Sequence, residues 1–257
     1  MMISHVSHAR TADGSLILVN PSHPLPQQLP PALMPVDPRH PDILLERRAA
    51  QLLRACIHAV KAEGQIVPVS GWRSQAEQQA IWDETWAKEG EAFTRQYVAI
   101  PGCSEHQTGL AIDLGLAAPE IDFIRPHFPE DGICGSFRRA AAQYGFVLRY
   151  PAGKEAITHI AHEPWHFRFV GVPHSALMTE LGLTLEEYLL YLRGFSPANP
   201  LQYQNGAYRF LVYCLPPEAP AEAPGAGEYL QCSDDNQGGR IITRWRRAAP
   251  WTSGAAI

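Results

Sequence analysis

The sequence predicts an α+β fold with a central antiparallel sheet, helices packed on one side of that sheet and a small β appendage at the C-terminal end. Three observations predict it. Apolar residues recur at helical spacing in some stretches, such as 42–61, and alternate in others, such as 110–116. A Pro/Ala/Gly-rich stretch at 216–227 separates two apolar strands near the end. We therefore expect a main domain over residues 1–200 and an appendage over 201–257.

The first half of the chain contains two stretches typical of helices and two typical of strands. Apolar residues at helical spacing fill 42–61, and Gly64 closes that helix. Ser74 followed by Glu77 is a capping box, which starts a second helix. The elements expected in order are a strand at 15–20, a proline-rich loop to residue 41, a helix at 42–61, a strand at 65–70 and a helix from Ser74 towards Gly90.

Strands become more frequent after residue 110. In 110–116 large apolar residues alternate with Ala, Asp and Gly, which is typical of a strand with one face on a core and one face open. Thr184 and Glu187 form another capping box. The elements expected in order are a strand at 110–116, a helix at 136–144, strands at 146–149 and 166–170, a helix at 184–193 and, in the appendage, strands at 208–215 and 241–246.

The composition excludes several classes of protein. With 46% hydrophobic and 18% charged residues, the chain can bury a sizeable core and is not of the disordered class. A formal net charge of -5, with scattered basic residues, gives no nucleic-acid or acidic-membrane surface. Five cysteines without CxxC spacing favour a reducing compartment, and residues 1–20 carry no signal-like apolar segment. We therefore expect a cytoplasmic protein with no nucleic-acid or membrane partner.

A first cluster of metal-binding residue types lies in 104–113. Asp113 points to the open face of its expected strand, where Ala111 and Gly115 leave room above the carboxylate. His106 has the wrong strand parity to share that face, but Gly109 lies between the two and can supply a bend or bulge. Catalytic zinc sites use three protein ligands and keep one open position. We interpret both residues as ligands; a half-exposed aspartate on a strand edge is the alternative for Asp113.

A second cluster, 162–166, matches the zinc-binding pattern H-E-x-x-H, which lies on a helix in the proteases that use it. Pro164 inside the pattern disfavours a helix, and the residues that follow favour a strand. We therefore expect one ligand here, His166, with Glu163 in a tight loop beside it and His162 as a peripheral residue. A helical site that uses both histidines is the alternative.

The two clusters resemble the motifs of a known family. Ser104, His106, Gly109, Ala111 and Asp113 resemble the SxHxxGxAxD motif of the LAS metallopeptidases, which include lysostaphin-type enzymes, D-Ala-D-Ala metallopeptidases and hedgehog. The run Glu163-Pro164-Trp165-His166 resembles the family's ExWH motif, and Ser70-Gly71-Trp72-Arg73-Ser74 resembles its SGYRS segment. Over residues 15–195 the chain further resembles VanXY-type D,D-dipeptidase/D,D-carboxypeptidases, and the appendage does so weakly. The implied fold is hedgehog/D,D-peptidase-like.

The resemblance implies a zinc-dependent hydrolase that removes the C-terminal D-Ala from D-Ala-D-Ala dipeptide or from peptidoglycan precursor pentapeptides. Such an activity is linked to glycopeptide resistance or to editing of cell-wall precursors. The expected partner is a D-Ala-D-Ala-containing dipeptide or muropeptide precursor. The implied roles are His106, Asp113 and His166 as zinc ligands, Glu163 as general base, Arg73 near the scissile carbonyl, Ser104 and Gln78 at the substrate's C-terminal end, and Trp165 as a wall of the site.

A function of a different class stays open. A LAS-fold protein that binds a partner and holds a structural zinc needs neither a general base nor an arginine at the carbonyl. The presence of Glu163 and Arg73 in the matching positions favours the enzyme. Arg73 has a second interpretation as a surface arginine beside a helix, and Trp165 as a core residue. The sequence does not decide between dipeptidase and carboxypeptidase activity.

Overall fold

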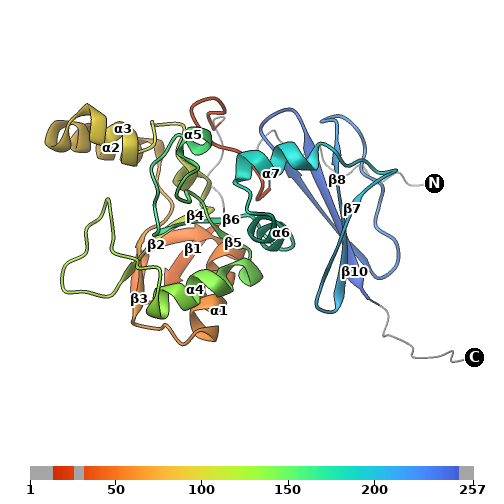
Figure 1. Ribbon diagram of the computed structural model, residues 1–257, viewed down its shortest axis with the longest axis horizontal. Helices are drawn as coiled ribbons and strands as arrows, with labels where there is room; N and C mark the ends of the chain where they lie inside the picture. Colours follow the sequence, from red (N-terminus) through yellow and green to blue (C-terminus); the bar gives the residue numbers. More distant parts are fainter. Residues whose placement is uncertain (1–13, 26–31, 249–257) are drawn as a thin grey trace, which may run out of the picture.

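The main domain is built on a four-stranded antiparallel sheet. The computed structural model describes residues 14–25 and 32–248 (Figure 1). The sheet confirms the expected fold class and the strands expected near 65–70, 110–116, 146–149 and 166–170. Its strands, in spatial order, are β3 (Ile66–Ser70), β4 (Ala111–Leu116), β6 (His166–Phe169) and β5 (Phe146–Leu148).

Two helices, α1 (Arg47–Ala59) and α4 (Gly132–Ala141), cover one face of this sheet (Figure 1). Their apolar side chains share one core with those of the strands. Phe137 of α4 packs edge to face on Phe167 of β6, with ring centroids 5.0 Å apart. The opposite face is therefore left to the polar side chains of β4 and β6. The short helical turns of the fold are η1 (Glu105–Thr108), η2 (Ala142–Tyr144) and α5 (Glu155–Thr158).

A β-hairpin that the sequence did not predict precedes α1. Its strand β1 (Leu33–Asp37) pairs antiparallel with β2 (His40–Glu46). The helix expected at 42–61 therefore begins only at Arg47, and the prediction of its start was wrong. Glu46 ends β2 and caps the helix, because its carboxylate accepts hydrogen bonds from two backbone N–H groups of the first turn.

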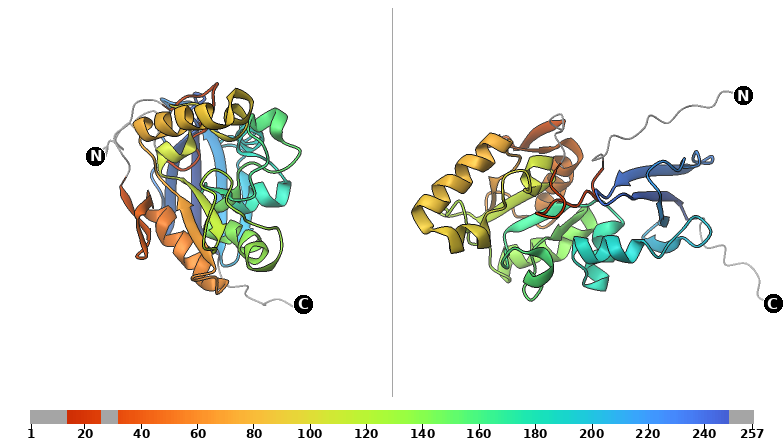
Figure 2. Two further views of the ribbon diagram at one scale, coloured as in Figure 1. Left: turned by 90° about the vertical axis from the view of Figure 1, so that its left-hand side faces the viewer. Right: turned by 90° about the horizontal axis from the view of Figure 1, so that it is seen from above.

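Two helices, α2 (Gln75–Glu89) and α3 (Glu91–Tyr97), lie at the end of the main domain farthest from the C-terminal strands (Figures 1 and 2). The predicted capping box starts α2. The hydroxyl of Ser74 accepts a hydrogen bond from the N–H of Glu77, and the carboxylate of Glu77 accepts one from the N–H of Ser74. The sequence did not predict α3.

A second four-stranded antiparallel sheet forms the C-terminal part of the chain (Figure 1). It confirms the small β appendage, and two of its strands match those expected at 208–215 and 241–246. The other two were missed because neither forms an apolar run: the side chains of Leu201–Asn205 alternate between half-buried and exposed, and those of Glu228–Asp234 are mostly half-buried and largely polar. The division of the chain at residue 200 stays a prediction. In spatial order the strands are β7 (Leu201–Asn205), β8 (Tyr208–Leu215), β10 (Arg240–Arg247) and β9 (Glu228–Asp234).

Two further helices, α6 (His174–Leu181) and α7 (Leu185–Leu192), lie between the two sheets (Figure 1). Their apolar side chains form a second core with strands of both sheets, and this core includes Val147 of β5 and Ile241 of β10. The capping box predicted at Thr184 starts α7. The second core fixes α7 close to the main sheet, on the side away from α1 and α4.

Residues 15–20 are buried but do not form the strand expected there. Their apolar side chains are almost completely buried, yet the backbone has only an isolated bridge, between Asn20 and His23, and single hydrogen bonds such as that from Leu18 N to the carbonyl oxygen of Asp235. The guanidinium of Arg168 donates hydrogen bonds to the carbonyl oxygens of Ser15 and Ile17. A side chain thus takes the place of a pairing strand, which the apolar run in the sequence did not indicate.

Candidate active site

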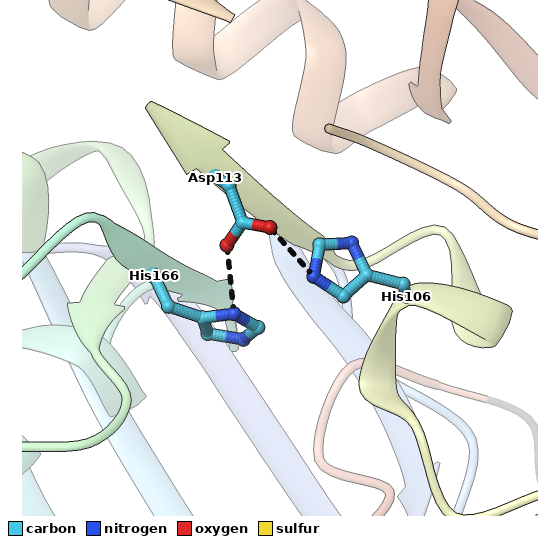
Figure 3. Close-up of side chains that lie close together, drawn as sticks. All are labelled: His106, Asp113 and His166. Atoms are coloured by element: carbon cyan, nitrogen blue, oxygen red, sulfur yellow. Dashed lines mark hydrogen bonds and ion pairs between the residues drawn. The ribbon is translucent and has the colours of Figure 1, made fainter. Parts of the chain in front are cut away.

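The three residues predicted as ligands come together on the open face of the main sheet. β4 carries Asp113, β6 begins with His166 directly beside it, and η1 carries His106. Nε2 of His106 lies 3.1 Å from Oδ2 of Asp113, and Nδ1 of His166 lies 2.9 Å from Oδ1 (Figure 3). All three are buried, and one donor atom from each lies within 4.8 Å of the others. This arrangement is a possible metal site.

The bend that brings His106 to Asp113 is at Gly109, as the sequence predicted. η1 ends at Gly109, whose φ of 73° and ψ of 10° lie in the left-handed region. That conformation costs glycine little and other residues more. The turn reverses the chain between η1 and β4, so that the imidazole and the carboxylate meet despite their unfavourable strand parity.

The H-E-x-x-H stretch is not helical. Residues 161–165 contain no helix, and β6 starts at His166. Within the part of the chain that the structure describes, His162 belongs to no metal-binding group. The helical alternative for this pattern is therefore wrong, and the break that Pro164 was expected to cause is confirmed.

The orientation of His106 is fixed by the SGWRS segment. Nδ1 of His106 lies 2.7 Å from the carbonyl oxygen of Gly71, so this nitrogen carries the proton and donates it, and Nε2 keeps a free lone pair. A Cβ atom at Gly71 would lie 2.2 Å from the carbonyl oxygen of Leu44. Glycine is therefore required at this position so that the backbone can approach both β2 and η1.

Arg73 is not the surface residue that the alternative interpretation described. Its side chain is 14% exposed, and its Nη2 lies 3.1 Å from Oδ2 of Asp113. Its Nε donates to the hydroxyl of Ser70 and its Nη1 to Oε1 of Gln78, over 2.9 and 3.1 Å. The amide nitrogen of Gln78 in turn donates to the carbonyl oxygen of Ala99. The oxygen of Gln78, a residue expected at the substrate's C-terminal end, thus contacts Arg73, and the contact with Ala99 fixes the orientation of this amide.

Glu163 is a buried carboxylate at the edge of the cluster. Its side chain is 6% exposed, and its Oε2 lies 3.6 Å from Nδ1 of His166. Burial raises the pKa of Glu163 to about 8, with Asp113 as a further negative charge nearby. A carboxyl group with a raised pKa takes up a proton readily near neutral pH.

The cluster combines a permanent carboxylate with an uncharged imidazole. Burial would raise the pKa of Asp113, but the charges and hydrogen bonds of His106 and His166 outweigh it and hold the pKa far below its usual range. Burial and the nearby Arg73 lower the pKa of His106 to about 4. At neutral pH, His106 therefore has a lone pair available for a metal ion.

The cluster lies in a pocket that opens to the solvent. Ser104 and Trp165, both singled out from the sequence, lie in its wall together with Arg73 and Glu163. Trp165 is also part of the main core, and its contact with substrate stays a prediction. The lining residues that the sequence did not indicate include Tyr97 at the end of α3 and three residues from separate loops, Phe123, Tyr150 and Ile160, and they share no spacing in the sequence.

A buried group of charged residues behind the site was also missed. Glu105 of η1 is in ion-pair contact with Arg149 and Arg168, each over 2.7 Å. A signal was present in the sequence. Arg168 lies between two phenylalanines in an apolar strand, and a buried arginine requires a carboxylate partner.

The sequence matches a known protein family. The family model VanY, D-alanyl-D-alanine carboxypeptidase, matches residues 42–172, which include His106, Asp113 and His166. The chain belongs to the VanY family. The match spans the main sheet from its first strand to the end of β6.

Relatives of this VanY-family chain include two from enterococci. It is 44% identical over 181 residues to the bifunctional D-Ala-D-Ala dipeptidase and carboxypeptidase VanXYC of Enterococcus gallinarum, covering 70% of this chain and 95% of the relative. It is 28% identical over 257 residues to a D-alanyl-D-alanine carboxypeptidase of Enterococcus faecium, covering 93% of this chain and 77% of the relative.

Two solved structures resemble it. The D,D-dipeptidase VanXYg, in complex with a D-Ala-D-Ala phosphinate analog, has a TM-score of 0.86 and 46% identity over 91% of this VanY-family chain and 94% of its own. A D,D-pentapeptidase VanY variant with Zn(II) has a TM-score of 0.59 and 32% identity over 68% of this chain and 98% of its own. A match over 91% of 257 residues must extend beyond residue 200, so VanXYg shares part of the second sheet.

Proposed function

We propose that this chain is a zinc-dependent D,D-peptidase that hydrolyses the bond before a C-terminal D-Ala. The observation that supports it best is the meeting of His106, Asp113 and His166 in one buried group, with Glu163 and Arg73 beside it in the same cavity. The relatives support the substrate class, since VanXYC acts on D-Ala-D-Ala and VanXYg binds a phosphinate analog of it.

The residues of the cluster fit a zinc ion. Two imidazole nitrogens and one carboxylate oxygen are the donor set of a catalytic zinc site with three protein ligands. The carbonyl of Gly71 sets the tautomer of His106 in the way that metal-binding histidines require. A bound zinc ion would supply Lewis-acid chemistry, acidifying a water molecule and polarising a carbonyl. That a VanY structure contains Zn(II) supports the same choice of metal.

Glu163 acts as the general base. Its buried carboxylate takes the proton of the attacking water at an oxygen and passes it to the leaving nitrogen. Burial raises the pKa of Glu163 to about 8 in the metal-free protein, and the positive charge of a bound zinc ion would lower it, so that the carboxylate is ionised and can take up the proton. General acid–base catalysis of this kind typically contributes about 100- to 10,000-fold to the rate.

Arg73 stabilises the negative charge that develops on the carbonyl oxygen. Its guanidinium is held from two sides by Ser70 and Gln78, so it is ordered before substrate arrives. A preorganised donor of this kind is typically worth about 3 kcal/mol of the barrier. Gln78 then contributes by positioning Arg73, in addition to the substrate contact expected from the sequence.

The substrate's C-terminal carboxylate is the natural handle of an exopeptidase. The hydroxyl of Ser104, in the cavity wall, is the proposed donor to it, and Trp165 forms part of the wall. A small pocket favours a methyl side chain over larger ones. The preference for D-alanine is supported by the relatives and not by the geometry.

The test is an assay of D-Ala release with and without metal. The protein is stripped with a chelator and then given Zn²⁺, with free D-Ala-D-Ala and a UDP-linked pentapeptide as parallel substrates. We expect D-Ala release to stop when the metal is removed and to resume when Zn²⁺ is added. The ratio of the rates with the dipeptide and with the pentapeptide then gives the balance of dipeptidase and carboxypeptidase activity. Zinc binding without hydrolysis of either substrate would favour the non-catalytic alternative.

The cellular role is also a proposal. Within residues 14–25 and 32–248, no helix has the length and apolar character needed to cross a membrane. We propose action in the cytoplasm on cell-wall precursors, in agreement with the reducing compartment expected from the cysteines. If the enzyme contributes to glycopeptide resistance, its expression with a D-Ala-D-Lac or D-Ala-D-Ser pathway raises vancomycin tolerance, and unchanged tolerance would count against this role.

A further inference from the structure

The two nitrogens of the His166 imidazole have different surroundings. Nδ1 faces the cluster, 2.9 Å from Oδ1 of Asp113. Nε2 points the opposite way, and the closest carboxylate oxygen on that side is Oε2 of Glu105, 3.7 Å away. A neutral imidazole carries one proton, so Nδ1 has a lone pair for a metal ion only if the proton is on Nε2.

Both atoms on the far side lack a partner. Among the residues that the structure describes, Nε2 of His166 and Oε2 of Glu105 are buried polar atoms without a hydrogen bond. Buried polar groups in folded proteins are nearly always paired, so two such atoms that face each other need an explanation. A shift of less than about 1 Å brings the pair into hydrogen-bond distance.

We propose that Glu105 is a positioning residue of the metal centre: its carboxylate accepts the Nε2 proton of His166 and so keeps Nδ1 free to bind the metal. This inference rests on the metal site proposed above. A carboxylate behind a metal-binding histidine orients the ring and increases the donor strength of the imidazole. The same short helix η1 thus provides one ligand directly, His106, and orients a second one.

The remaining contacts of Glu105 explain why Oε2 is the free oxygen. Oε1 is 2.7 Å from Nε of Arg149 and 2.7 Å from Nη1 of Arg168, so both guanidinium groups converge on one oxygen. Arg149 also donates to both carboxylate oxygens of Glu186 in α7, over 2.9 and 2.6 Å. Two arginines hold the carboxylate in its ionised form and aim its second oxygen at His166.

A purely structural role is the competing explanation, in which Glu105 only neutralises the two buried arginines. Glu186 provides a matched control, because it also contacts Arg149 but does not contact His166. The variants Glu105→Gln and Glu186→Gln each remove one charge with little change in shape. Zinc affinity is measured by competition with a chromophoric chelator, and the ligand field by the visible spectrum of the Co²⁺-loaded proteins.

We expect Glu105→Gln to weaken zinc binding by roughly 10- to 100-fold and to shift the cobalt bands, and Glu186→Gln to change affinity by less than about threefold. Equal weakening in both variants, or none in Glu105→Gln, would overturn the proposal. Should Glu105→Gln fail to fold, the ¹H resonance of the Nε2 proton of His166 is measured in the zinc-loaded wild type. A strongly downfield resonance, typical of a hydrogen bond to a carboxylate, supports the proposal, and a resonance without that shift contradicts it. A protein that binds no zinc would instead contradict the metal site itself.

Discussion

Nη2 of Arg73 lies 3.1 Å from Oδ2 of Asp113, so a buried guanidinium is in direct contact with a carboxylate of the metal cluster. The same carboxylate also faces His106 and His166. This contact connects two parts of the proposed mechanism, metal binding and stabilisation of the carbonyl oxygen. Asp113, a proposed metal ligand, positions Arg73, the proposed donor to that oxygen. Changes at Arg73 and at the ligands should nevertheless have separable effects, on rate and on metal content.

The first prediction concerns Arg73. Arg73→Lys keeps the charge but loses the planar fork that contacts Ser70 and Gln78 together. We expect kcat/KM for D-Ala-D-Ala to fall by about 100- to 1,000-fold while zinc content stays at the wild-type level. Arg139→Lys, on the exposed side of α4, is the control and should leave both quantities unchanged. Loss of zinc from Arg73→Lys would contradict a role confined to the reacting oxygen.

The second prediction concerns the ligand set. Metal analysis of purified variants should show bound zinc lost from His106→Ala, Asp113→Ala and His166→Ala, because three donors are needed to hold the ion. His162→Ala should retain it, since His162 lies outside the group. Retention in Asp113→Ala together with loss in His162→Ala would show that the ligands were wrongly assigned.

The third prediction is a dependence of stability on pH in the metal-free protein. Burial raises the pKa of Glu163 from 4.5 to about 8, so the folded protein keeps a proton that the unfolded chain releases above pH 4.5. The free energy of unfolding should therefore fall as pH rises from about 5 to about 8. At higher pH Glu163 is ionised in both the folded and the unfolded state, and it adds no further pH dependence.

Glu163→Gln removes this contribution. Because the glutamine carries no charge to bury, the variant should exceed the wild type in stability at pH 8 by on the order of a few kcal/mol and by much less at pH 5. Urea unfolding at the two pH values measures the difference. The difference includes the effect of Glu163 on His166, because the charge of Glu163 helps to raise the pKa of that imidazole. A difference that is the same at both pH values would refute the assignment.

The fourth prediction concerns the bend at Gly109. Gly109→Ala forces a Cβ atom into a left-handed conformation and should cost about 1–2 kcal/mol of stability. It should also weaken zinc binding, because His106 is positioned by this turn. Gly182→Ala is a matched control: it has φ 64°, lies at the end of α6 and has open space around its Cβ position. It should lose similar stability and keep its zinc affinity, and equal affinities in the two variants would speak against the role of the bend.

Features set by neighbouring residues were predictable from the sequence. The capping boxes at Ser74 and Thr184 involve residues three apart, and both are formed. The left-handed turn at Gly109 and the break at Pro164 follow from the conformational limits of glycine and proline. Because these local features control where the three side chains point, the meeting of His106, Asp113 and His166 could be predicted without knowledge of the fold.

Features set by distant residues were not predictable. The apolar run at 15–20 has the pattern of a strand, but the carbonyl oxygens of Ser15 and Ile17 accept hydrogen bonds from the guanidinium of Arg168, which is distant in sequence. The residues 42–46 suit a helix equally well, and only pairing with β1 makes them a strand. The same limit applies to Glu105, whose position behind His166 depends on Arg168 of β6 and on Arg149, which directly follows β5.

The rate of D-Ala release from D-Ala-D-Ala by zinc-loaded wild type and zinc-loaded Glu163→Gln tests the central claim most directly. We predict that the wild type releases D-Ala and that the variant, with the same zinc content, does so about 100- to 10,000-fold more slowly. Equal rates in the two proteins would contradict the assignment of Glu163 as the base that drives the reaction.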